Sequence, residues 1–127
     1  MQHIAMLVGR ILMSAIFIQA AMSKLLSPLD TINYFESLGL PLATLVTWLV
    51  IILELFGGLA VLLGFRIRIA ATVLGFFSIA AALIGHSDFS STIHLQAFMK
   101  DLAIAGGLFY MAAHGAGLIS FDARREA

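Results

Sequence analysis

Long apolar runs separated by short polar segments dominate the pattern of this 127-residue chain. A helix needs about 20 mostly apolar residues to cross the hydrocarbon core of a bilayer. Segments that meet this requirement predict transmembrane helices over residues 4–26, 42–65, 69–86 and 101–120. Because these four spans take up most of the chain, we expect residues 1–127 to form one domain, an all-α integral membrane four-helix bundle.

The connection between the first two predicted spans has a helical pattern of its own. Leu29, Ile32 and Phe35 recur at helical spacing, with polar residues between them. Ser27-Pro28 is typical of a helix start, and Gly39 is typical of a helix end. We therefore expect a short amphipathic helix in this first outer loop, lying at the membrane interface.

The composition supports a membrane protein and excludes several kinds of cofactor. Hydrophobic residues make up 61% of the chain and charged residues 11%, whereas soluble domains average about 45–50% apolar and about 25% charged residues. The absence of cysteine excludes iron–sulfur clusters, thiolate metal sites and covalently attached haem. The net charge of zero gives no reason to expect nucleic acid as a partner, so the lipid bilayer is the expected surrounding.

The placement of basic residues predicts how the chain is oriented in its membrane. With four spans, the N-terminus, the loop between the second and third spans, and the C-terminal tail lie on one side. That side has five basic residues and the opposite side has two, Lys24 and Lys100. The excess of Lys and Arg on cytoplasmic loops therefore predicts that both termini are cytoplasmic. The five are Arg10, Arg66, Arg68, Arg124 and Arg125.

Glu54 is the most informative residue, because it lies near the middle of the second predicted span. A charged side chain at the bilayer centre costs about 2.5–3.5 kcal/mol on insertion scales, so it is expected to face the protein interior beside a cation. Arg10 in the first span is the expected partner, and Lys24 is the second candidate. Two interpretations stay open: a buried ion pair that fixes helix register, and a proton-handling or ligand-binding carboxylate.

Other polar residues near the ends of the predicted spans are expected to join Glu54 in an intramembrane polar cluster. Lys100 and Asp101 lie at the start of the fourth span. A lysine in the first turn of a helix interacts unfavourably with the helix dipole. Lys100 is therefore expected to contact an acid or an anionic ligand. His86 is a candidate hydrogen-bond donor to a quinone carbonyl, or an interfacial polar residue. The four histidines lack the spacing of a metal site, so no metal is expected. The predicted cluster comprises Arg10, Lys24, Glu54, Arg68, His86, Lys100 and Asp101.

Short motifs occur in a characteristic order along nearly the whole chain. Their order and spacing resemble those of the DoxX family of bacterial inner-membrane proteins. The motifs are Gly9-Arg10-Ile11, Ser23-Lys24-Leu25, Gly39-Leu40-Pro41, Glu54-Leu55-Phe56-Gly57-Gly58, Leu63-Gly64-Phe65 before Arg68, Gly85-His86, Phe98-Met99-Lys100-Asp101-Leu102-Ala103, Gly106-Gly107 and His114-Gly115-Ala116-Gly117.

The resemblance implies four transmembrane helices in the cytoplasmic membrane and an association with redox metabolism. We therefore expect an accessory or quinone-interacting subunit of membrane redox metabolism, with a quinone as a non-covalent cofactor and a redox enzyme or a second copy as partner. A non-catalytic scaffold or assembly factor is the alternative. A small transporter is a weaker alternative, because no internal repeat or broken helix is visible. No residue is assigned a catalytic role.

Overall fold

The computed structural model describes residues 1–86 and 88–126, which form helices joined by short connections and contain no strand. The first helix ends at Leu26, where Pro28 occupies the first turn of the next helix and its missing N–H does not interrupt any hydrogen bond. The helices are α1 (Gln2–Leu26), α2 (Pro28–Ser37), α3 (Ala43–Leu63), α4 (Ile67–Gly85), α5 (Thr92–His114) and α6 (Phe121–Glu126).

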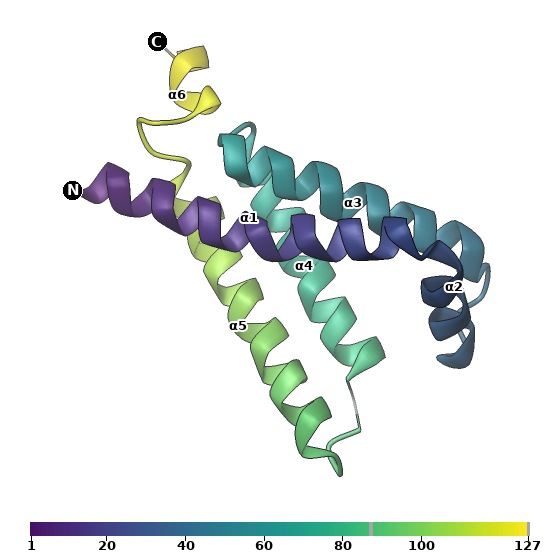
Figure 1. Ribbon diagram of the computed structural model, residues 1–127. Coiled ribbons are helices and arrows are strands. Elements are labelled where there is room, and N and C mark those ends of the chain that lie inside the picture. The colour runs from purple at the N-terminus through teal and green to yellow at the C-terminus, as the bar shows by residue number, and fades with distance from the viewer. Residues whose placement is uncertain (87, 127) are drawn as a thin grey trace.

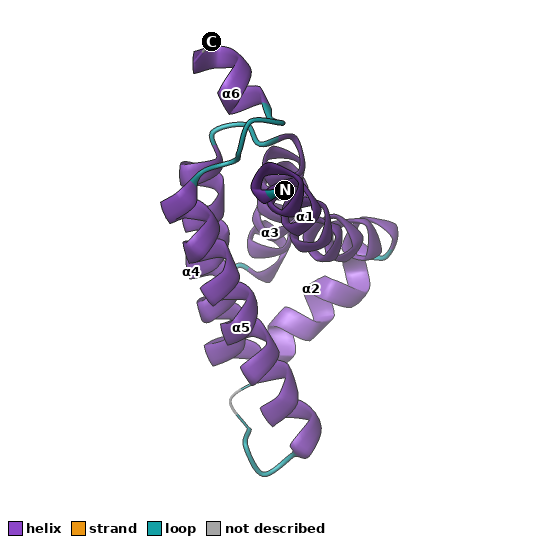
Figure 2. Cartoon of the chain, turned by 90° about the vertical axis from the view of Figure 1, so that its left-hand side faces the viewer, coloured by secondary structure: helices purple, strands orange, loops and turns teal. Residues whose placement is uncertain are grey.

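The four long helices form two antiparallel pairs that diverge from each other (Figure 1). One pair is α1 with α3 and the other is α4 with α5, and the main contact between the pairs is that of α3 with α4. Helix α2 packs against α3 and α1 at the end of the first pair. Figure 2 shows α2 on the side of the first pair that faces α5. Helix α6 lies at the other end, near the N-terminus (Figure 1).

Three of the helices in the described residues, α1, α3 and α4, are long and apolar enough to cross a membrane. Helix α5 is long but less apolar, because its first half contains Lys100 and Asp101. Large apolar side chains such as Leu12, Phe56 and Phe76 are more than half exposed on the outer surfaces of the three apolar helices. Such surfaces are suited to lipid rather than to water.

The fourth predicted span differs from the helix that the structure contains. The span was expected over residues 101–120 because the sequence has no charged residue from 102 to 121, but α5 starts at Thr92 and ends at His114. The backbone leaves the helix because Gly115 and Gly117 have φ values of +85° and +86°, in the left-handed region that glycine adopts without steric cost. Residues 115–120 therefore form a loop that leads to α6.

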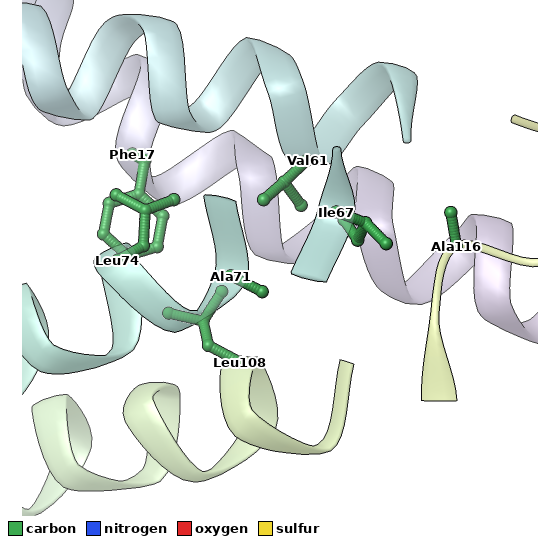
Figure 3. Packing of buried hydrophobic residues seen from close by; sticks show 7 residues of the cluster. All are labelled: Phe17, Val61, Ile67, Ala71, Leu74, Leu108 and Ala116. Atoms are coloured by element: carbon green, nitrogen blue, oxygen red, sulfur yellow. The ribbon is translucent and has the colours of Figure 1, made fainter. Parts of the chain in front are cut away.

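The core lies where the two helix pairs meet (Figure 3). Every long helix contributes to it, and Ala116 of the loop after α5 extends it. The side chains of Val61, Ala71, Leu74 and Leu108 are fully buried there, which gives the crossing close contacts in the absence of any hydrophobic driving force from lipid. The cluster consists of Phe17, Val61, Ile67, Ala71, Leu74, Leu108 and Ala116.

Close contact between α4 and α5 depends on Gly75. A Cβ atom at this position would lie 2.7 Å from Cε1 of Phe109, closer than carbon atoms approach without displacement. We expect Gly75→Ala to lower the free energy of unfolding by about 1–3 kcal/mol, as overpacking does elsewhere. Thermal unfolding in detergent, followed by circular dichroism, measures the change.

Gly106 on α5 provides the matched control, because a Cβ atom there would have no neighbour within 4 Å. Gly106→Ala is expected to be neutral or to stabilise the helix by up to about 1 kcal/mol, since alanine has the higher helix propensity. Equal stabilities for the two variants would contradict a close α4–α5 contact at Gly75.

Candidate functional site

The structure divides the predicted polar cluster between opposite ends of the molecule. Lys24, Glu54, His86, Lys100 and Asp101 line one cavity at the end where α2 lies. Arg10 and Arg68 lie instead at the α6 end, where their side chains contact backbone carbonyl groups. The residues of the predicted cluster therefore form two groups with different partners.

Glu54 is buried between the helices of the first pair. Its residue is 5% exposed, and the Nζ atom of Lys24 lies 2.7 Å from its Oε1 atom. The antiparallel packing of α1 and α3 produces this contact, because it brings Lys24 near the C-terminal end of α1 to the middle of α3. The ammonium group of Lys24 is the one partner of Oε1 among the described residues, so the carboxylate retains capacity to accept further hydrogen bonds.

Arg10, the expected partner of Glu54, binds elsewhere. Its guanidinium donates hydrogen bonds to the carbonyl oxygens of Leu62, at 3.3 Å, and of Ile119. Leu62 follows Glu54 by eight positions, which is about 12 Å along a helix at 1.5 Å per residue. A guanidinium that binds the end of α3 is therefore too far from Glu54 to pair with it. Arg10 is 1% exposed and joins α1 to the end of α3 and to the C-terminal loop.

Arg68 caps the end of α5 rather than joining the cavity. Its Nη1 atom donates to the carbonyl oxygens of Ala112 and Ala113, each at 2.9 Å. The last carbonyl groups of a helix have no partner within the helix, and a cation there also complements the helix dipole. This contact fastens α4 to α5 at the α6 end of the molecule.

Asp122 is an important residue that the sequence analysis did not identify. Its two carboxylate oxygens accept hydrogen bonds from the backbone N–H groups of Arg66, at 2.6 Å, and Ile67, at 2.8 Å. These two N–H groups lie at the N-terminal end of α4, whose own N-cap residue makes no side-chain hydrogen bond to them. The short turn before α4 lacks a Ser, Thr, Asp or Asn at its end, and this missing N-cap was the available signal that a distant residue must supply one.

His86, directly after the end of α4, and Asp101 on α5 lie near each other. The Nε2 atom of His86 is 3.9 Å from Oδ2 of Asp101, and its Nδ1 atom is 3.3 Å from Nδ1 of His94. His94 was not predicted as a site residue, because its spacing to His86 places it on a different helix. Beside them in the loop, hydrogen bonds from Ser90 lower the pKa of Asp88. The described residues contain no group of three or more His, Asp or Glu side chains arranged to hold a metal ion.

A cavity of about 510 Å³ connects these polar groups. Its walls are mainly apolar and come from all five helices before α6, including Phe17, Phe77 and Ile104. Tyr34 and Phe35 of α2 line it on one side. Lys100 lines it without an ion-pair partner among the described residues. The volume falls in the range of about 300–1,000 Å³ of small-molecule sites, which combine apolar walls with a few polar groups.

The helical fold, the three spanning helices and the buried charges define a multi-span helical membrane protein. The chain belongs to the DoxX family, whose sequence model matches residues 5–87. It is 38% identical to the inner membrane protein YqjF of Escherichia coli K12, over 96% of this chain and 92% of that protein. It is 30% identical to the inner membrane protein YphA of the same organism, over 95% and 90% of the two chains. No solved structure matches the chain.

These findings agree with the resemblance seen in the sequence and with the expected membrane. The chain is a DoxX-family protein of the bacterial inner membrane. Both relatives match this chain along almost their whole length.

Proposed function

We propose that the cavity beside Glu54 binds the head group of a quinone and that the chain is an accessory subunit of membrane redox metabolism. The observation that carries this proposal is a mainly apolar cavity of about 510 Å³ lined by a buried carboxylate whose partner among the described residues is the single ammonium group of Lys24. An ionised carboxylate accepts several hydrogen bonds, so a bound ligand that donates to Glu54 would use acceptor capacity that Lys24 leaves.

The polar groups of the cavity match both forms of a quinone. The carbonyl oxygens of the oxidised form need donors, and Lys100 and His86 supply N–H groups at the cavity wall. The hydroxyl groups of the reduced form need an acceptor, and Oε1 of Glu54 is one. Phe17 and Phe77 supply aromatic surface for the ring.

A bound quinone would supply two-electron, two-proton redox chemistry that no side chain of this protein provides. The chain has no cysteine for a cluster or thiolate-bound metal. The electrons must therefore come from or pass to a partner, and a membrane redox enzyme is the kind of partner that this role requires. The residues of the cavity would bind and orient the head group, while the partner carries out electron transfer.

The proposal includes a fourth membrane crossing, by α5, and an interfacial position for α2. Helix α5 pairs with α4 along its length, and its residues 102–114 have no Asp, Glu, Lys or Arg. Helix α2 has no buried residue and joins two spanning helices through short connections, which suits a helix at the level of the head groups. The α6 end, rich in arginine, then faces the cytoplasm.

Binding of a short-chain quinone to the purified full-length protein tests the proposal. We expect Glu54→Gln to weaken binding about tenfold, because a hydrogen bond to a charged group contributes about 1.5–3 kcal/mol. Isothermal titration in mild detergent measures the affinity, and extraction of native protein shows whether quinone accompanies it. Glu36→Gln is the matched control, because Glu36 is exposed on α2 and does not line the cavity.

A second variant separates ligand binding from effects on the ion pair. Ala81 lines the cavity wall on α4, so Ala81→Phe is expected to fill the cavity and abolish binding with Glu54 and Lys24 unchanged. Absence of quinone binding by the native protein, together with co-purification of a redox enzyme, would instead favour the scaffold function. Quinone binding that survives both Glu54→Gln and Ala81→Phe would place the ligand elsewhere.

A further inference from the structure

Charge is distributed very unevenly between the two ends of the molecule. Five of the seven Lys and Arg residues, but only two of the seven Asp and Glu residues, belong to the α6 end. One of these two acids, Asp122, accepts hydrogen bonds from the backbone at the start of α4. The basic residues are Arg10, Arg66, Arg68, Arg124 and Arg125, and the acidic ones are Asp122 and Glu126.

A second cavity, of about 500 Å³, opens at this basic end. It shares no lining residue with the cavity beside Glu54. Two cationic side chains, Arg66 and Arg68, line it together with His3 and His114. Asp122 also lines the cavity, but both of its carboxylate oxygens accept backbone hydrogen bonds at the start of α4. The two guanidinium groups therefore leave an excess of positive charge at this end of the spanning helices.

Several donors in this cavity have hydrogen-bonding capacity left. The guanidinium of Arg66 lies 5.8 Å from the ring of Phe65 and makes no hydrogen bond within the described residues. Arg68 uses Nη1 for the carbonyl groups of α5, and its Nη2 atom remains. His3 accepts the backbone N–H of Leu118 at Nδ1, so in this tautomer its Nε2 atom carries a proton and is a donor.

We infer that this basic cavity binds the phosphate group of an anionic phospholipid. Guanidinium groups bind phosphate oxygens through charge-assisted hydrogen bonds. Ile69 and Leu118 also line the cavity and are 60% and 70% exposed, so apolar surface adjoins the cations and suits an acyl chain. This combination favours a lipid over free phosphate, and the inference is independent of quinone binding.

The test compares lipids with identical acyl chains added to the full-length protein in a neutral detergent. We expect phosphatidylglycerol to bind about tenfold more tightly than phosphatidylcholine, since each basic residue near the head groups contributes about 1 kcal/mol. Native mass spectrometry measures the bound fraction, and a thermal shift measures the stabilisation. Soluble glycerol 3-phosphate, which lacks acyl chains, is expected to produce neither effect at the same concentration.

Two matched variants distinguish the cavity from general attraction between charges. Arg66→Gln removes a cavity cation and is expected to weaken phosphatidylglycerol binding about fivefold. Arg124→Gln removes the same charge from the exposed face of α6, outside the cavity, and is expected to change binding by less than about twofold. Equal binding of the two lipids, or equal losses in the two variants, would overturn the inference. Binding of glycerol 3-phosphate as tight as that of the lipid would overturn the assignment to a phospholipid.

Discussion

Replacement of Arg10 by methionine is expected to lower the free energy of unfolding by about 3 kcal/mol, because hydrogen bonds from a charged donor contribute about 1.5–3 kcal/mol each. The guanidinium binds carbonyl oxygens of Leu62 and Ile119 in an almost fully buried position. Methionine fills part of the same space but leaves both carbonyl groups without a donor. Thermal unfolding in detergent should show a fall of about 10 °C in melting temperature.

Arg124→Met is the matched control for this prediction. Arg124 is exposed on α6, and exposed substitutions away from such contacts usually change stability by less than about 0.5 kcal/mol. Arg10→Lys is expected to be intermediate, because an ammonium group is a single point donor and cannot span two separated carbonyl groups as a guanidinium does. A melting temperature for Arg10→Met within error of that of Arg124→Met would show that Arg10 does not join the helix ends.

The long helices follow from the apolar pattern of the sequence. Helix α1 (Gln2–Leu26) and helix α3 (Ala43–Leu63) correspond closely to the spans expected over 4–26 and 42–65, because apolar runs bounded by Pro28 and Gly64 leave little choice of structure. Helix α5 starts at Thr92, nine residues before the span expected from 101, because the helix continues through Lys100 and Asp101, where the charges had suggested a membrane boundary.

The partners of the buried charges could be predicted only in part. Residue spacing gives the depth of a side chain along its helix, but it does not give the rotation and crossing of the helices that decide which neighbour it meets. The burial of Glu54 follows from its cost in lipid, whereas the choice between Arg10 and Lys24 depends on how α1 packs on α3. Asp122 escaped prediction because its partners are backbone N–H groups: the sequence shows that α4 has no N-cap of its own, but it does not show which distant residue supplies one.

Removal of Lys24 is the second prediction with a large expected effect. Lys24→Met leaves Glu54 buried without a cation, and breaking a buried ion pair by removing one partner costs about 3–5 kcal/mol. Because the side chain of Lys24 is 24% exposed, we expect a loss of about 3 kcal/mol, at the lower end of that range. The melting temperature in detergent measures it.

The double variant Lys24→Met with Glu54→Met distinguishes a structural role of the ion pair from a role of Glu54 in ligand binding. Apolar residues of similar volume often replace a buried pair without loss of stability, so the double variant is expected to regain most of the stability that Lys24→Met loses. If the pair serves only to hold α1 on α3, the double variant should bind quinone like the native protein. If Glu54 accepts a hydrogen bond from the ligand, binding should be lost although the fold is restored. Stability and binding that fall and recover together would contradict a ligand role for Glu54, because the carboxylate would then act only through the packing of the two helices.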